Sequence, residues 1–80
     1  MQANKLIAVI AEHSGRTYNR LSADLGRSRE YVRQAASKAA PSIATVADVA
    51  DVAGCDVCIV DRVTGAIVAT VTPPRKAARE

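Results

Sequence analysis

The sequence predicts a mostly α-helical fold that ends in a β-hairpin. Up to Gly54, four segments carry apolar residues three and four positions apart, which is the spacing of one helix face. After Gly54, two short runs are rich in the β-branched residues that strands favour. The chain has 80 residues and no Phe or Trp, so its core is small and must be filled by smaller aliphatic side chains. We therefore expect a helical domain over residues 1–54, a hairpin over 55–72 and a flexible basic tail over 73–80.

The first two helices are predicted from their apolar stripes and end signals. The first covers residues 3–13 and is ended by Ser14 and Gly15. Its stripe consists of Ala3, Leu6, Ile7, Ile10 and Ala11. Thr17 is suited to cap the second helix, because its hydroxyl can accept a hydrogen bond from the first turn, and Gly26 ends that helix. The inward residues of the second helix are Leu21, Ser22 and Leu25.

Serine caps predict where the next two helices begin. Ser28 is expected to cap a third helix over about 29–38, which is followed by the helix breaker Pro41. Its apolar side consists of Val32, Ala35 and Ala36. Ser42 is expected to cap a fourth helix that ends at Gly54. The buried stripe of this fourth helix consists of Ile43, Val46, Ala47, Ala50 and Ala53.

The hairpin is predicted from strands over 56–60 and 66–71, joined by a turn over 61–65 that starts with Asp and ends with Gly. Side chains alternate between the faces of a strand, so one face carries Ile59 and the other Val60, and both are apolar. We expect one face to pack on the helices and the other to meet the same hairpin of a second subunit about a two-fold axis. The alternative is a hairpin wrapped into its own domain with one exposed apolar patch. The expected dimer contacts are Val57, Ile59, Ile67, Val68 and Val71.

Charge is unevenly distributed along the chain. The formal net charge is +3. Residues 14–40 hold six basic and two acidic side chains, a net charge of +4, whereas residues 41–72 hold one basic and four acidic side chains, a net charge of −3. A cationic face of this kind favours a polyanion as partner, because neutralising phosphates releases their counterions. The alternative is a solvated arginine-rich surface.

The spacing of the second and third helices matches a helix-turn-helix. Its side chains would lock the two helices at a steep angle around Gly26, which can take a positive φ, and the small Ser22 permits close approach. The stretches LSADLGRSREYVRQA and PSIATVADVADVAG resemble the phage-repressor-like (XRE-type) regulators, related to the repressors and Cro proteins of lambdoid phages. The resemblance covers about Thr17 to Gly54. It implies a four-helix domain whose third helix enters the major groove of DNA.

Carried over by position, the resemblance implies two sets of DNA contacts. Arginine can bond to guanine, glutamine to adenine, and glutamate can accept from cytosine. The base-reading candidates are Arg29, Glu30, Arg33 and Gln34. Glu30 has the alternative role of stabilising the helix dipole. The phosphate-contact candidates lie at helix ends and flanks and are Thr17, Tyr18, Arg20, Arg27, Ser28, Ser37 and Lys38.

Four further residues have mainly structural interpretations. The Tyr31 ring is expected to pack toward the first helix, the alternative being a phosphate contact through its hydroxyl. Cys55 and Cys58 are expected to be reduced structural thiols that a strand points to opposite faces. His13 is expected to be a surface residue at a helix C-terminus.

These residues favour a binding protein. The sequence contains no arrangement typical of a catalytic site, so we expect no enzyme, metal, cofactor or small-molecule ligand. We expect a dimeric repressor of phage or mobile-element type that binds an inverted repeat in double-stranded DNA. The alternative is a protein-binding module on the same scaffold, such as an antitoxin or a phage-encoded inhibitor of a host defence complex. No window is long and apolar enough to span a bilayer and no leader is evident, so a cytoplasmic location in a bacterial or phage-infected cell is expected.

Overall fold

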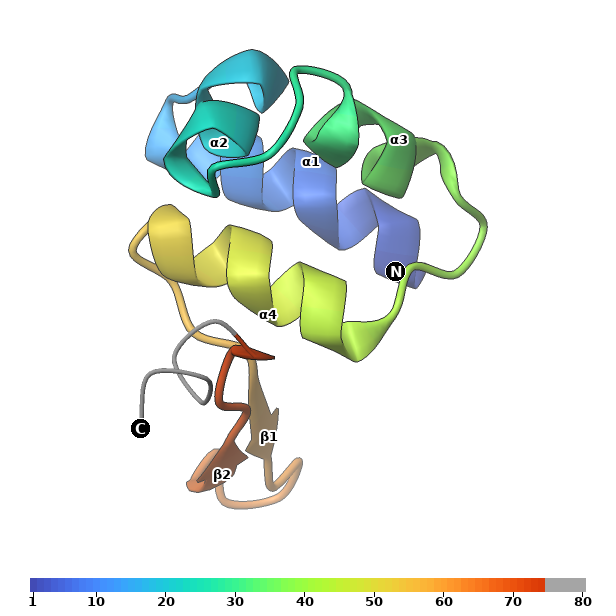
Figure 1. The fold of residues 1–80 in the computed structure, drawn as a ribbon. Helices are drawn as coiled ribbons and strands as arrows, with labels where there is room; N and C mark the ends of the chain where they lie inside the picture. Colours follow the sequence, from blue (N-terminus) through green and yellow to red (C-terminus); the bar gives the residue numbers. More distant parts are fainter. Residues whose placement is uncertain (75–80) are drawn as a thin grey trace.

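The computed structural model describes residues 1–74, which form four helices and one two-stranded antiparallel hairpin (Figure 1). The elements are α1 (Ala3–Ser14), α2 (Tyr18–Asp24), α3 (Tyr31–Ser37), α4 (Ile43–Val52), β1 (Cys58–Val60) and β2 (Ile67–Thr70). The predicted mostly α-helical fold with a C-terminal hairpin is confirmed. Most of the tail that was expected over 73–80 lies outside the described residues.

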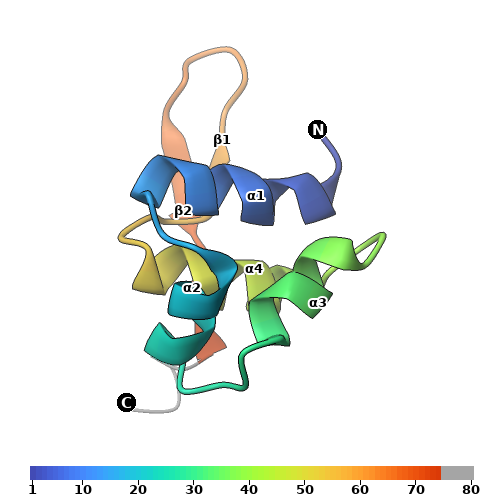
Figure 2. The ribbon, with the colours of Figure 1, turned by 90° about the horizontal axis from the view of Figure 1, so that it is seen from above.

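The four helices pack around one aliphatic core (Figures 1 and 2). Helix α1 lies against α3 and α4, and α2 also packs against both α3 and α4. The clustered buried side chains are Ile7, Ile10, Ala11, Leu21, Val32, Ala35, Val46, Val49 and Ala50. We refer to this unit of four helices as the body. No helix among residues 1–74 is long and apolar enough to cross a membrane.

The predicted N-caps at Thr17 and Ser42 are confirmed. The Thr17 Oγ1 accepts a hydrogen bond from the Arg20 N–H at 3.1 Å. The Ser42 Oγ accepts one from the Thr45 N–H at 3.2 Å. Both side chains satisfy donors that the first turn of a helix leaves unpaired.

The buried face of α4 differs from its predicted stripe. Ile43 was expected in the core but is 63% exposed, because it is the first residue of the helix and lies one turn before the packed part. Val49 is instead fully buried. Leu6 of α1 was also expected to be buried and is 38% exposed. The buried faces of α1 and α4 are therefore rotated slightly about the helix axes relative to the stripes that periodicity alone predicts.

The turn of the hairpin is held by Asp61 and Gly65. The Asp61 Oδ1 accepts hydrogen bonds from the N–H groups of Val63 at 2.9 Å and Thr64 at 3.0 Å. Gly65 has a φ of 75°, a conformation that glycine adopts without steric cost, and its N–H donates to the Asp61 carbonyl at 2.8 Å. Ile59 pairs with Ala69 and Val60 with Ile67, so the register shifts between Ile59 and Val60. Both strands are shorter than predicted, although the Val71 N–H also donates to the Val57 carbonyl at 2.8 Å just before β1 begins.

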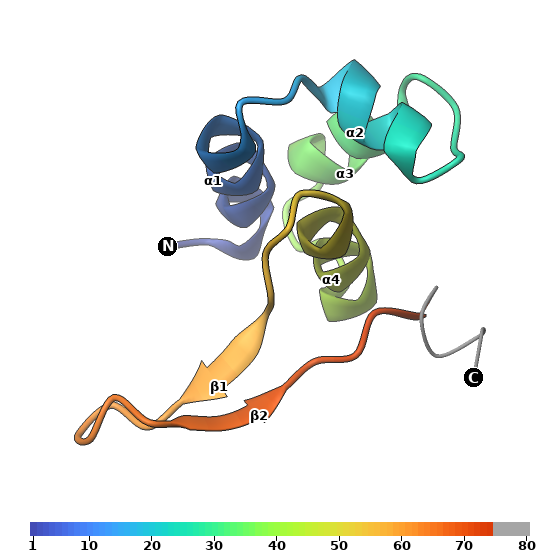
Figure 3. The same ribbon diagram turned by 90° about the vertical axis from the view of Figure 1, so that its left-hand side faces the viewer.

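The hairpin projects from the body as an arm, which we define as residues 58–70 (Figure 3). It joins the helices at its base, residues 55–57, where Val57 is half-buried against the core. Beyond the base, four β-branched residues are 50–67% exposed. They are Ile59, Val60, Ile67 and Val68. The expectation that one face of the hairpin packs along the helices is therefore wrong, because the arm points away from them.

Candidate nucleic-acid interface

Helices α2 and α3 are joined by buried contacts that include one hydrogen bond. Leu21 of α2 and Val32 of α3 are both fully buried. Between them, the Oγ of the fully buried Ser22 accepts a hydrogen bond from the Val32 N–H at 3.1 Å. That N–H lies in the first turn of α3, where no intrahelical acceptor is available. The sequence indicated only the small size of Ser22, although a hydroxyl at a buried position was the available signal for such a bond.

The chain reverses after α2 at Gly26, whose φ is 68°. The Gly26 N–H donates to the Ala23 carbonyl at 2.9 Å, and the Arg27 N–H donates to the Ser22 carbonyl at 3.0 Å. These two bonds form the Schellman ending, in which a glycine in the left-handed region closes a helix. They set the direction in which residues 27–30 leave α2.

Helix α3 begins at Tyr31, two residues later than predicted, and ends at Ser37. The Ser28 side chain does not cap it; instead the Ser28 carbonyl accepts from the Tyr31 N–H at 3.0 Å, which closes a tight turn. The first helical hydrogen bond of this region runs from the Gln34 N–H to the Glu30 carbonyl at 2.8 Å. Arg29 and Glu30 therefore lie in the turn that leads into the helix.

The outer side of α3 carries a continuous polar stripe. Its residues are three and four positions apart, and all are exposed. They are Glu30, Arg33, Gln34 and Ser37, which we call the outer stripe. The Arg33 Nε lies 3.7 Å from the Glu30 Oε2, and both side chains are more than half exposed. An exposed pair of this kind is weak, so Arg33 can exchange Glu30 for another acceptor at small cost.

Arg27 and Tyr31 form a stacked pair beside the start of α3. The Arg27 guanidinium lies 5.0 Å from the centre of the Tyr31 ring. The ring is half-buried and packs against the core, in line with the expectation that it packs inward. A cation held over an aromatic face loses part of its freedom. The pair thus presents a positive charge at the surface next to the outer stripe.

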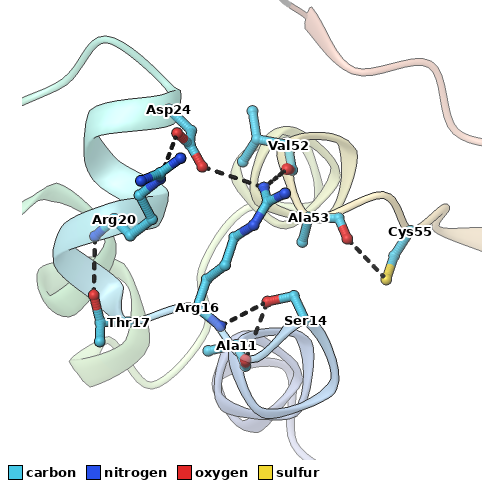
Figure 4. A network of polar contacts seen from close by, with 9 residues as sticks. All are labelled: Ala11, Ser14, Arg16, Thr17, Arg20, Asp24, Val52, Ala53 and Cys55. Carbon is cyan, nitrogen blue, oxygen red and sulfur yellow. Dashed lines mark hydrogen bonds and ion pairs between the residues drawn. The ribbon is translucent and has the colours of Figure 1, made fainter.

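Asp24, the last residue of α2, binds two arginines (Figure 4). Its Oδ1 lies 3.2 Å from the Arg20 Nε, and its Oδ2 lies 3.2 Å from the Arg16 Nη1. The same Arg16 nitrogen donates to the Val52 carbonyl at the end of α4. Arg16 therefore ties α2 to α4, a role that sequence reasoning did not assign to it. Arg20, a predicted phosphate contact, is thus partly neutralised by its ion pair with Asp24.

The remaining predicted phosphate contacts differ in their surroundings. The Thr17 hydroxyl is used as a helix cap, and Tyr18 is half-buried against the core. The Ser37 Oγ donates to the Gln34 carbonyl at 2.9 Å. Arg29 and Lys38 are exposed and form no ion pair with any residue in 1–74. These two residues, with Arg27, are the cations of this region that no carboxylate neutralises within the described chain.

The two cysteines lie at the opposite end of the molecule, at the base of the arm. Both are free and half-buried, and both border one cavity between α1, α4 and β1. The strand that was expected to hold both cysteines begins only at Cys58, and Cys55 precedes it. Among residues 1–74, no group of three or more His, Cys, Asp or Glu side chains is arranged to hold a metal ion.

The chain was compared with protein-family models, with curated proteins and with solved structures, and no significant match was found.

Proposed function

We propose that this protein is a sequence-specific DNA-binding transcriptional regulator, a dimeric repressor of the phage-repressor-like helix-turn-helix type. The observation that carries the proposal is the outer stripe of α3. Its exposed side chains include Arg33 and Gln34, and it stands on a helix that buried contacts hold against α2. Groups that read base edges must be exposed and must stand on a firmly held element, and the buried contacts between α2 and α3 support this for the stripe.

In the proposed complex, the outer stripe of α3 lies in the major groove. Arg33 exchanges Glu30 for the O6 and N7 atoms of a guanine, and Gln34 bonds to an adenine. Glu30 is then available to accept from a cytosine amino group. Arg29 approaches the groove from the turn before the helix. Each well-placed bidentate contact discriminates against the wrong base by about 1–3 kcal/mol.

Flanking cations position the domain on the phosphate backbone. Arg27 and Lys38 lie on either side of α3 in the chain and carry no ion pair within residues 1–74. Contacts to phosphates orient the protein without reading sequence, and they make the affinity depend steeply on salt. The acidic residues of α4 and the arm follow these cations in the chain, which leaves the region around α3 the more positive one.

The arm supplies the proposed dimer contact. A two-stranded hairpin that packs on nothing is marginally stable in water, and this arm exposes apolar residues on both of its faces. A second copy, related by a two-fold axis, covers this surface. The two α3 helices then become symmetry mates that enter successive major grooves about 34 Å apart. The proposed operator is therefore an inverted repeat.

Selection of binding sites from randomised duplexes tests this function. We expect Arg29→Ala and Arg33→Ala each to weaken specific binding by about 1–3 kcal/mol and to relax the preference at one base position of each half-site. Lys38→Ala is the matched control, since it removes an exposed cation of the same region and should weaken all sequences alike.

An unchanged preferred motif in both arginine variants contradicts the base-reading role of α3. If the wild-type protein shows no preference and no steep salt dependence, the DNA-binding proposal fails, and a protein partner for the same face is favoured instead.

A further inference from the structure

An apolar cavity opens at the junction of the body and the arm. Its volume is about 290 Å³, and the side chains around it come from α1, α4 and the base of the arm. They include Leu6, Ile10, Val46, Ala50 and Val57. Asp56 is the charged residue on its rim, and its side chain is exposed. Since an apolar cavity of roughly 150 Å³ already holds a benzene molecule, this one has room for a branched aliphatic side chain.

The tip of the arm carries an apolar residue that the fold of a single chain does not use. Val63 is 89% exposed, more than any other large hydrophobic residue in the described chain. The turn around it is held by Asp61 and Gly65, so its geometry does not require a valine at this position. Arg62, the neighbour of Val63, is exposed and forms no ion pair within residues 1–74.

We propose that a second copy of this chain fills the cavity with the tip of its arm. Val63 of each subunit enters the cavity of the other, and Arg62 pairs with the partner's Asp56. The exchange is reciprocal and rests on the dimer proposed above. It adds a specific contact to that dimer, because two arm faces could pack together without either tip entering a cavity.

Two properties of the chain favour this occupant. The first is geometric. When two arms lie antiparallel about a two-fold axis, the tip of each reaches the base of the other. An axis that crosses the arms between base and tip brings Val57 opposite Val63 of the second copy, because a two-fold axis exchanges the two ends of an antiparallel pair. Val57 to Val60 follow the strand, a rise of about 10 Å, and the turn over 61–65 then carries Val63 at the tip.

The second property is charge complementarity. Arg62 is the single basic residue of residues 41–72, and it stands directly beside the apolar tip residue. Asp56 stands at the rim of the apolar cavity. An apolar group with one adjacent cation thus faces an apolar cavity with one carboxylate, so the two surfaces match in both polarity and charge.

Disulfide cross-linking of the full chain tests the proposal directly. Cys55 and Cys58 border the cavity, so Val63→Cys brings a third thiol next to them only if the tip of another subunit enters. Mild oxidation with diamide, which takes up the two thiol hydrogens, should yield a covalent dimer on a non-reducing gel. Peptide mapping should join position 63 to Cys55 or Cys58.

Two variants control the cross-linking. Ser28→Cys places a thiol on the exposed turn between α2 and α3 and should give no such link. Adding Cys55→Ser and Cys58→Ser to Val63→Cys should abolish it. A link between the two introduced thiols at position 63, or no link under conditions in which the protein is dimeric, overturns the proposal.

A charge exchange provides a second test. Arg62→Asp and Asp56→Arg each place like charges together and should raise the dimer dissociation constant about threefold to tenfold in analytical ultracentrifugation. Both side chains are exposed, so neither change should unfold the body. The double variant, in which the charges are exchanged, should recover most of the wild-type affinity. Failure of the double variant to recover contradicts the ion pair.

The tests separate this inference from the proposed function. If the protein selects an inverted repeat but gives no link between position 63 and Cys55 or Cys58, the proposed function is supported and the exchange of tips is contradicted. If the protein gives the link but shows no preference among DNA sequences, the exchange of tips is supported and the proposed function is contradicted. A chain that stays monomeric at high micromolar concentration overturns the exchange.

Discussion

The body and the arm contain similar aliphatic residues, but these side chains are buried in the body and exposed in the arm. In the body, Ile7, Leu21, Val32 and Val49 are fully buried, although the core contains no Phe or Trp. In the arm, Ile59, Val60, Ile67 and Val68 are 50–67% exposed. The body thus provides its own burial, whereas the described part of the chain leaves these arm residues uncovered. Stability should depend on the first region and association on the second.

The largest effect on stability is expected in the body. Leu21→Ala removes a fully buried side chain that packs between α2 and α3, and it should lower the free energy of unfolding by about 2–5 kcal/mol. A domain of this size has a total of only about 4–12 kcal/mol. Urea unfolding followed by circular dichroism measures the change. Ile67→Ala is the control in the arm and should cost less than about 1 kcal/mol at concentrations where the protein is monomeric. Equal losses in the two variants would show that the regions are not distinct.

The next effect concerns association. Val68→Asp places a charge on the exposed surface of the arm, where it is solvated in the monomer and would be desolvated in the proposed dimer. We expect the dimer to weaken by roughly 2–4 kcal/mol, while the melting temperature of the body at low concentration stays unchanged. Light scattering and thermal unfolding at matched concentrations separate the two outcomes. A fall in the melting temperature without dissociation would mean that the arm supports its own body.

The body was predictable from sequence because its signals are local. Thr17 and Ser42 cap helices where expected, since an N-cap acts on the turn that follows it. The arm's direction was not predictable, because alternation along a strand shows which side chains share a face but not what covers it. Ile43 and Val49 exchanged places relative to the prediction for a similar reason. Periodicity gives the approximate face of a helix, and the neighbouring helices decide how wide the buried face is and at which turn burial begins.

The candidate interface shows the same division between local and distant effects. The outer stripe of α3 follows from helical spacing, so Arg33 and Gln34 were predictable as exposed neighbours. The contact of Arg16 with Asp24 and the Val52 carbonyl joins segments far apart in sequence, and no local pattern indicates it. The delayed start of α3 depends on the turn from Ser28 to Tyr31, which competes with the side-chain cap that a serine suggests.

A smaller loss of stability is expected when a buried hydroxyl of the body is removed, and almost none when an exposed one is removed. Ser22→Ala leaves the Val32 N–H buried without an acceptor and should destabilise the protein by about 1–3 kcal/mol. Ser37→Ala is the matched control, because its exposed hydroxyl donates only to a carbonyl of its own helix. Urea unfolding of both variants gives the difference, and hydrogen exchange at the Val32 amide should speed up only in the first. Equal stability of the two variants would remove the assigned role of Ser22 in joining α2 to α3.

The smallest effect is a pH dependence confined to the arm. Hydrogen bonds from the backbone N–H of Thr64, and then of Val63, lower the pKa of Asp61 from its ordinary value of 3.8. Because the folded pKa lies below the unfolded one, the carboxylate stabilises the turn fully above pH 3.8 and loses this contribution as the pH falls through the folded pKa. Titration of the Val63 and Thr64 amide resonances from about pH 6 to about pH 2 should give a midpoint below the ordinary value. Asp61→Asn keeps an oxygen acceptor for both N–H groups but cannot ionise, so its turn should lack this transition. A midpoint at or above 3.8 in the wild-type protein would show that the carboxylate does not hold the turn in solution.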